Sequence, residues 1–190
     1  MQRTQALQRT LGLMEGFPAP WCVAGGWAVD LFLGKVTREH GDVDIAIFRD
    51  DQRAVHDHFR GWQVRKVVRG QLVEWPADEW LERPVHEIHV RAPQGGRSVE
   101  FLLNERSGNV WVFRRYPAVT YPASDVMRRG QDGIPFLAPA LVLLYKAKSP
   151  RPCDERDFEQ ARGALSRKER RWLKDAIQLV HPGHEWLGRL

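Results

Sequence analysis

The chain has 190 residues, a formal net charge of +5, 43% hydrophobic residues and 28% charged residues, which suits one globular domain, or one domain with a small appendage. It has no apolar run near the roughly 18 residues that cross a bilayer, and its opening residues are amphipathic rather than signal-like, so we expect a cytoplasmic protein with no membrane partner. Its two cysteines, Cys22 and Cys153, have neither the spacing of a metal site nor that of a disulfide framework, and they fit a reducing compartment.

The first two thirds of the sequence alternate helical and strand patterns. Leu7, Leu11 and Met14 recur at helical spacing, and Gly34 ends a second helical segment. We expect Asp50 to cap a third helix. In chain order the predicted elements are a helix at 3–15, a strand at 21–25, a helix at 27–33, a strand at 42–48, a helix at 50–59, and strands at 62–68, 71–75, 85–91, 98–103 and 110–113.

The last third of the sequence is helical. The segment 138–148 is apolar on most sides and has Pro139 near its first helical position, which predicts a buried helix. A second helix is expected at 154–165. Ser166 and Glu169 then form a capping-box pattern, which opens a third helix.

These elements predict an α+β fold, in which a mixed sheet with flanking helices is followed by a short helical tail. No repeat, low-complexity tract or long linker interrupts the chain. We therefore divide it into a core of residues 1–135 and a helical subdomain of residues 136–190.

Two aspartates stand in the segment "DVDIAIF", which otherwise has the pattern of a buried strand. Alternation along a strand places Asp42 and Asp44 on one face, with Cβ atoms ~7 Å apart. An unpaired buried carboxylate is costly, and two are worse. Carboxylates so placed can share Mg²⁺, which prefers oxygen ligands and is completed by substrate phosphates.

Gly25 and Gly26 stand where a predicted strand ends and a helix begins. Free backbone N–H groups at a helix start bind anions, and glycine allows a phosphate to approach closely. A Gly-Gly pair alone is also common in plain turns. The order strand, Gly-Gly, helix and Asp-x-Asp strand is the more specific pattern.

A two-metal site usually requires a third carboxylate, which holds a metal or accepts a proton. Glu100 lies inside an apolar strand pattern, and we favour it over Glu87 on a neighbouring strand. The structural alternative for Glu100 is an ion pair with a nearby arginine.

The histidines give weaker signals. On a strand His89 and Glu87 share a face, whereas His86 points away, so these three residues are not expected to form one metal site. His56 and His58 lie on a predicted exposed helix and are interpreted as surface residues.

Charge is unevenly distributed along the chain. Residues 71–90 carry five acids against one arginine, and with Trp75 and Trp80 among them they would suit a cationic or sugar-like acceptor. Residues 146–174 carry ten basic residues against five acidic ones and would suit phosphates or nucleic acid. Both segments are equally compatible with solvated surfaces, and nucleic acid is the less favoured partner.

The stretch "GGWAVDLFLGKVTREHGDVDI" resembles the signature of small antibiotic nucleotidyltransferases, the aminoglycoside 2″-adenylyltransferases and lincosamide nucleotidyltransferases of the polymerase-β-like superfamily. A second segment, "LLYKAKSPRPCDERDF", resembles the lysine-bearing helix and acidic motif of the same group. The resemblance implies the nucleotidyltransferase fold. It also implies metal-dependent transfer of a nucleoside monophosphate, most simply AMP from ATP, to a hydroxyl group of a small molecule such as an antibiotic.

Each site residue takes a role from this resemblance. Asp42 and Asp44 would hold Mg²⁺, with two ions expected, and Glu100 would complete the metal site and accept the proton of the acceptor. Phosphates and nucleotide would be bound by the remaining site residues, namely Gly25, Gly26, Arg38, His40, Lys146 and Lys148.

The chain departs from the superfamily pattern at two places. Many members have Gly-Ser where this chain has Gly25-Gly26, and Cys153 replaces a basic residue of the acidic motif. Asp154 and Asp157 are therefore interpreted as charges that complement the helix dipole. The alternative functions are a catalytically degenerate nucleotide- or RNA-binding module and an enzyme that modifies RNA or protein. A monomer and a homodimer both remain open.

Overall fold

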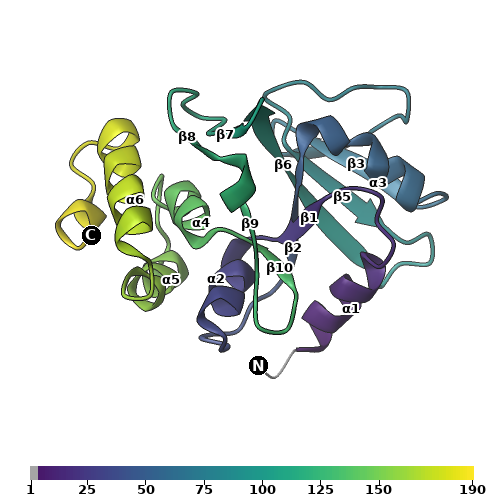
Figure 1. Cartoon of the computed structure of the whole chain (residues 1–190). Coiled ribbons are helices and arrows are strands. Elements are labelled where there is room, and N and C mark those ends of the chain that lie inside the picture. Colours follow the sequence, from purple (N-terminus) through teal and green to yellow (C-terminus); the bar gives the residue numbers. More distant parts are fainter. Residues whose placement is uncertain (1–3) are drawn as a thin grey trace.

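A mixed β-sheet forms the centre of the computed structural model, which describes residues 4–190 (Figure 1). The strands follow the order β4-β3-β5-β6-β2-β1-β10-β9, and β7 and β8 extend from β6. The strands are β1 (Trp21–Val23), β2 (Asp44–Phe48), β3 (Gln63–Val68), β4 (Gln71–Glu74), β5 (Glu87–Arg91), β6 (Ser98–Ser107), β7 (Val110–Val112), β8 (Thr120–Pro122), β9 (Met127–Arg129) and β10 (Pro135–Leu137).

The helices confirm the α+β class predicted from the sequence. They are α1 (Gln5–Leu13), α2 (Gly25–Leu33), α3 (Arg53–His58), α4 (Pro139–Lys146), α5 (Pro152–Arg162) and α6 (Arg167–Val180). The predicted start of the first helix, near residue 3, lies outside the described residues. Within residues 4–190 no helix is both long and apolar enough to cross a membrane.

Two local predictions are wrong. Asp50 does not cap a helix, because it lies in a 3-10 turn (Arg49–Asp51) that precedes α3, and it accepts a hydrogen bond from Arg106 Nε at 2.7 Å. The strand predicted at 42–48 begins only at Asp44, so Asp42 lies in the exposed loop before it.

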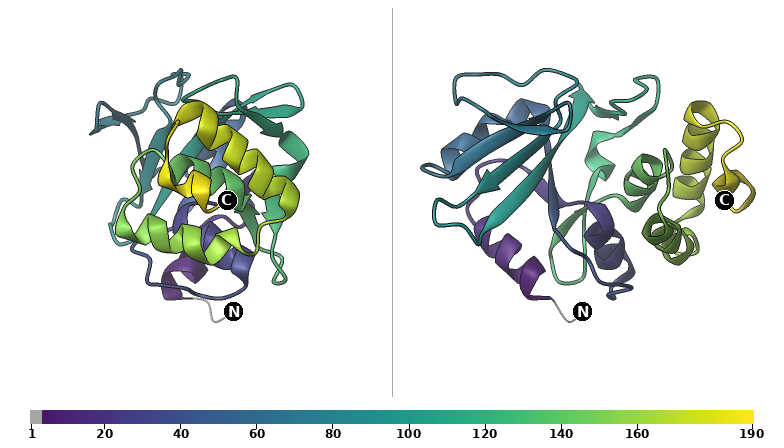
Figure 2. Two further views of the ribbon diagram at one scale, coloured as in Figure 1. Left: turned by 90° about the vertical axis from the view of Figure 1, so that its left-hand side faces the viewer. Right: turned by 180° about the vertical axis from the view of Figure 1, so that it is seen from behind.

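The two faces of the sheet differ in chemistry. Ile45, Ile88 and Phe101 are fully buried on one face, where the Phe101 ring stacks on Phe17 at 5.7 Å and meets Phe59 at 5.9 Å. Helix α3 covers this face in Figure 1. In the rear view of Figure 2 the strands β3, β5 and β6 therefore lie in front of α3. The residues that alternate with the apolar ones therefore line the open face, which carries the polar groups described below.

The three C-terminal helices stand beside α2 at one end of the sheet (Figure 1). Their interior is apolar, since the rings of Phe158 and Trp186 stack at 4.1 Å and α4 is buried over most of its length. The residues of β10 pair with β1 and β9, so the boundary proposed at residue 135 falls inside a strand of the sheet. We retain the division into core and helical subdomain as a proposal.

Candidate active site

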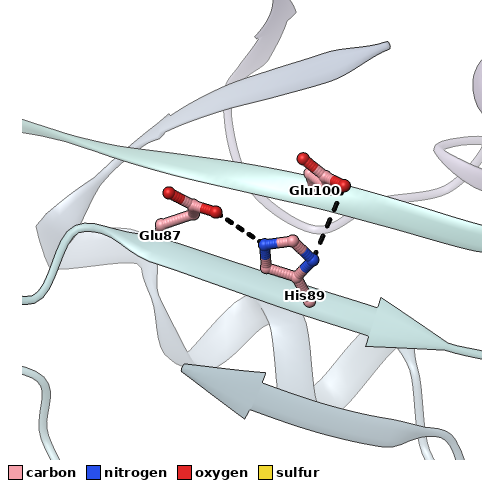
Figure 3. Close-up of side chains that lie close together, drawn as sticks. All are labelled: Glu87, His89 and Glu100. Carbon is pink, nitrogen blue, oxygen red and sulfur yellow. Dashed lines mark hydrogen bonds and ion pairs between the residues drawn. The ribbon is translucent and has the colours of Figure 1, made fainter. Parts of the chain in front are cut away.

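The acidic residues of the open face meet where β2, β6 and β5 lie side by side. Asp44 is the parallel partner of Glu100, and Glu100 is the antiparallel partner of His89. Residues paired in this way point to the same face. Figure 3 shows the His89 ring between two glutamates, with Nε2 at 2.6 Å from Glu87 and Nδ1 at 3.5 Å from Glu100. Glu87 and Glu100, the two candidates for the third carboxylate, thus belong to one cluster.

The charges of this cluster repel one another. Burial raises the pKa of Asp44 to about 6, and the neighbouring charges of Asp42, Glu100 and Glu87 add to the rise, against a smaller lowering effect of Lys146. Burial also raises the pKa of Glu100, and Asp42 and Glu87 add to this effect while His89 opposes it. Four carboxylates therefore create a negative potential that a bound cation would relieve.

Gly25 and Gly26 are required by the close approach of site residues. Gly25 has a φ of +60°, and a Cβ atom there would lie 2.3 Å from Asp44 Oδ2. A Cβ atom on Gly26 would lie 2.3 Å from Arg38 Nη2 and 2.5 Å from His40 Nδ1. Any side chain at these two positions would displace the groups around the carboxylates.

A buried aspartate holds the loop that carries Asp42. Asp30, on α2, is fully buried and accepts hydrogen bonds from the Thr37 backbone N–H at 3.1 Å and the Thr37 hydroxyl at 2.5 Å. Its second oxygen pairs with His40 Nε2 at 2.6 Å, and the His40 ring packs on Trp27 at 4.6 Å. His40 thus anchors the loop, and its predicted contact with the nucleotide stays a prediction.

A second buried network joins this loop to the helical subdomain. The Arg38 guanidinium donates to both carboxylate oxygens of Asp157, at 2.8 and 2.9 Å. Lys146 Nζ pairs with Asp157 at 3.0 Å and also with Asp154, which accepts from Arg151 Nε at 2.9 Å. Arg38 therefore has a structural partner, and its predicted nucleotide role stays a prediction.

The interpretation of Asp154 and Asp157 as first-turn helix charges holds for Asp154, which lies in the first turn of α5 and accepts from the Arg151 backbone N–H at 3.0 Å, but it is wrong for Asp157. Both are buried, and Asp157 lies beyond the first turn of α5. Burial alone would raise the pKa of each carboxyl group, but hydrogen bonds outweigh this effect and hold both pKa values below their usual range. Asp154 accepts these hydrogen bonds from Arg151 and Lys146, and Asp157 accepts them from Arg38 and Lys146. Sequence reasoning missed the link to Arg38, which lies 119 residues before Asp157 in the chain.

A cavity of about 300 Å³ opens beside Gly25, between β6 and α4. Its wall is strongly basic, and the ring of Tyr145 lies under the guanidinium groups of Arg114 at 4.6 Å and Arg115 at 5.3 Å. Five basic side chains line the cavity, namely Arg114, Arg115, Lys146, Lys148 and Arg151. This arrangement suits a polyphosphate with an aromatic base, placed next to Asp44.

Residues 6–114 match the family model described as aminoglycoside-2″-adenylyltransferase. The chain belongs to this family. A 2″-aminoglycoside nucleotidyltransferase of Escherichia coli is 27% identical over 157 residues, covering 66% of this chain and 84% of its own length. A lincosamide resistance protein of Staphylococcus haemolyticus is 25% identical over 132 residues, covering 64% of this chain and 81% of its own length.

Solved structures agree with the family at the level of the fold. The antibiotic-resistance factor ANT(2″)-Ia has a TM-score of 0.60 at 13% sequence identity, and the match covers 97% of this chain and 95% of that one. The lincosamide adenylyltransferase LnuA has a TM-score of 0.57 at 19% sequence identity, and the match covers 86% of this chain and 98% of that one. As a member of the aminoglycoside-2″-adenylyltransferase family, the chain is a nucleotidyltransferase whose co-substrate is a nucleoside triphosphate.

The structure brings most of the predicted site residues of this family member together. Asp42, Asp44 and Glu100 act on one another electrostatically, and Lys146 and Lys148 line the adjoining cavity. Their catalytic roles stay predictions.

Other sequence interpretations near the site do not hold. Trp75 is 2% exposed and donates to the Glu79 carbonyl, and the cavity that it lines with Glu74 includes none of the site carboxylates. His56 packs on Trp75 at 4.2 Å, and His58 bonds to the Leu13 carbonyl at 2.8 Å, so neither is a plain surface residue.

The sequence reasoning missed His89, Arg114 and Arg115 as members of the site. The Glu-x-His spacing on β5 was the available signal for His89. His86 does point away from the cluster, as predicted, and it lines the basic cavity instead.

Proposed function

We propose that the protein transfers a nucleoside monophosphate, AMP from ATP, to a hydroxyl group of a small molecule, with Mg²⁺ bound by Asp42, Asp44 and Glu100. The observation that supports the proposal most directly is that a negatively charged region and a positively charged region meet at Gly25. Carboxylates with raised pKa values lie on one side of it, and a basic cavity lies on the other. The relatives named for aminoglycoside and lincosamide modification make an antibiotic the first class of acceptor to test.

The carboxylates suit hard divalent cations. All their donor atoms are oxygens, as Mg²⁺ prefers. The raised pKa of Asp44 marks a site with more negative charge than the protein itself compensates. Bound divalent ions, of which we propose two, would supply charge neutralisation at the reacting phosphate and would favour ionisation of the acceptor hydroxyl.

The protein residues then orient the reactants. The basic cavity holds the triphosphate through Lys146, Lys148 and the two arginines of the β6–α4 wall, with Gly25 and Gly26 allowing the phosphates to approach closely. Lys146 is fixed by Asp154 and Asp157, so little side-chain entropy is lost when it meets the phosphate.

Glu100 lies on β6, on the side of β2 away from β1 and β10, and its side chain is 34% exposed, so an acceptor can reach it. It accepts the proton of the acceptor hydroxyl. The hydroxyl oxygen attacks the α-phosphorus, the bond from that phosphorus to the oxygen of the β-phosphate breaks, and pyrophosphate leaves. We place this activity in the cytoplasm, where ATP is available.

The test is a thermal-shift titration with Mg²⁺ and each of the four nucleoside triphosphates, followed by measurement of pyrophosphate release with a panel of antibiotics. We expect ATP to stabilise the protein only with a divalent cation, and at least one acceptor to trigger pyrophosphate release. Stabilisation by nucleotide without turnover on any small molecule, RNA or protein would instead indicate a degenerate binding module.

A further inference from the structure

Two further cavities meet on the side of Glu100 that faces away from the nucleotide cavity. One, of about 300 Å³, lies over β3, β5 and β6, and its lining includes His89 and Glu100. The other, of about 360 Å³, lies between α1 and the loop before β2, and its lining includes Asp42 and Glu100. The two share Glu100 and the segment 96–98. An acceptor that presents its hydroxyl to Glu100 must occupy this region.

Arginines surround this region. Arg65 and Arg91 line the first cavity, Arg9 lines the second, and Arg97 lines both. Arg65 pairs with His89 across neighbouring strands, so it stands in the same row of the open face as Glu100. Arg91 follows His89 by two residues on β5 and therefore points to the same face.

These four arginines have no carboxylate partner within ion-pair distance in the part of the chain that the structure describes. Some arginines elsewhere in the fold are paired, such as Arg38 with Asp157 and Arg49 with Glu105, whereas Arg114 and Arg115 lie over the Tyr145 ring. Arg97 is held instead by its contact with the Trp62 ring, at 5.4 Å. All four arginines are exposed, and guanidinium groups that line the region beside Glu100 without an ion-pair partner are suited to receive an anion.

The acids expected to attract a cationic acceptor do not line these cavities. Within residues 71–90, Glu79 pairs with Lys66, and Glu87 pairs with His89. Glu74 is the cross-strand partner of Arg65, and both line a neighbouring cavity together with Trp75, in which Glu100 takes no part. The acids that do line the region are Asp42 and Glu100, which belong to the proposed metal site.

We propose that the acceptor is a small hydroxyl compound that carries a carboxylate or phosphate group, and that Arg65, Arg91 and Arg97 bind this group while the hydroxyl faces Glu100. The inference rests on the proposed nucleotidyl transfer and defines its substrate class. A polycationic aminoglycoside would meet like charge in this region. The two cavities have the size of a small-molecule site rather than that of a groove that follows a nucleic-acid backbone.

The test compares sugars that share one ring and differ in charge: glucose 6-phosphate, glucuronate, glucose and glucosamine, with tobramycin as the polycation and a short single-stranded RNA as the macromolecule. Dissociation constants are measured by ligand-observed NMR and calorimetry in the presence of Mg²⁺ and a saturating non-transferable ATP analogue, which fills the other basic cavity. We expect both anionic sugars to bind at least about tenfold more tightly than glucosamine.

Charge-neutral variants distinguish binding by these arginines from the general attraction of a basic protein for anions. Arg91→Gln and Arg97→Gln together should weaken glucose 6-phosphate binding about tenfold and leave glucose unchanged. Arg167→Gln removes an exposed charge on α6 and should change neither value. Tighter binding of tobramycin or of RNA, absence of saturable binding of both anionic sugars, or equal effects of Arg167→Gln would overturn the inference.

The outcome is separable from that of the proposed function. A protein that is stabilised by Mg²⁺ and ATP and modifies a polycation keeps the proposed function and loses this inference. A protein that neither binds ATP nor releases pyrophosphate loses the proposed function itself.

Discussion

Replacing Asp44 by asparagine should stabilise the metal-free protein. The side chain is largely buried next to Asp42, Glu100 and Glu87, and burial with these charges raises the pKa of Asp44 from 3.8 to about 6. A carboxylate whose pKa is raised by folding favours the native state only while it is protonated. Asparagine has a similar shape but no charge, so the variant escapes the repulsion that wild-type protein retains above about pH 6.

The magnitude follows from the pKa. A rise from 3.8 to about 6 corresponds to about 3 kcal/mol at 1.36 kcal/mol per pKa unit, which sets the upper limit of the gain. The native state binds more protons than the unfolded state between these two values, so wild-type stability falls as pH rises through this window. The gain of Asp44→Asn should be absent near pH 3 and complete by about pH 7.

Urea denaturation in EDTA, across pH 3 to 8, measures this difference directly. Addition of Mg²⁺ should then stabilise wild-type protein and have a smaller effect on the variant, because a ligand of the ion has been lost. A variant that is no more stable than wild type at pH 8 in EDTA, together with a flat wild-type profile between pH 4 and 6, would refute the account of the carboxylate cluster.

Three further substitutions test other parts of the site. Gly25→Ala forces a side chain into a backbone with φ of +60°, so it should lower the free energy of unfolding in urea by about 1–3 kcal/mol and abolish transfer. The control Gly12→Ala, on α1 with open space around it, should be neutral or stabilising. Equal effects of the two variants would contradict the packing argument. Arg38→Met leaves Asp157 with one cationic partner and should lower the free energy of unfolding by about 2–4 kcal/mol, and a loss near zero would show that the ion pair contributes little. Glu100→Gln should lower kcat by about 10²–10⁴-fold with little change in ATP affinity, and unchanged kcat would exclude Glu100 as the proton acceptor.

Local patterns predicted the parts of the fold that neighbouring residues determine. The alternation in "DVDIAIF", the Gly-Gly turn and the capping box of Ser166 and Glu169 all have near neighbours as their physical cause. The capping box is present as predicted, with Ser166 and Glu169 bonding each other's backbone N–H.

Long-range contacts were beyond the same reasoning. Arg38 and Asp157 lie 119 residues apart in the sequence, so neither identity reveals the other. His89 meets Glu100 only because β5 and β6 pair in one register, and a shift of one residue would send the two side chains to opposite faces. The strands β8, β9 and β10 have three residues each, too short for periodicity to be seen.

The basic cavity was equally hidden from sequence reasoning. Arg114 and Arg115 follow a short strand and carry no motif, and only the packing of α4 brings Tyr145 beneath them. The sequence therefore indicated the carboxylates of the site and the two lysines of the cavity, Lys146 and Lys148, but not the arginines Arg114 and Arg115.

Mass spectrometry of acceptor mixtures incubated with ATP and Mg²⁺ tests the central claim most directly. Wild-type protein should add the mass of one nucleoside monophosphate to a hydroxyl acceptor, and Asp42→Asn and Asp44→Asn should each abolish the product while the folded state is retained. A product that persists in either variant would show that the paired aspartates are not the centre of the chemistry.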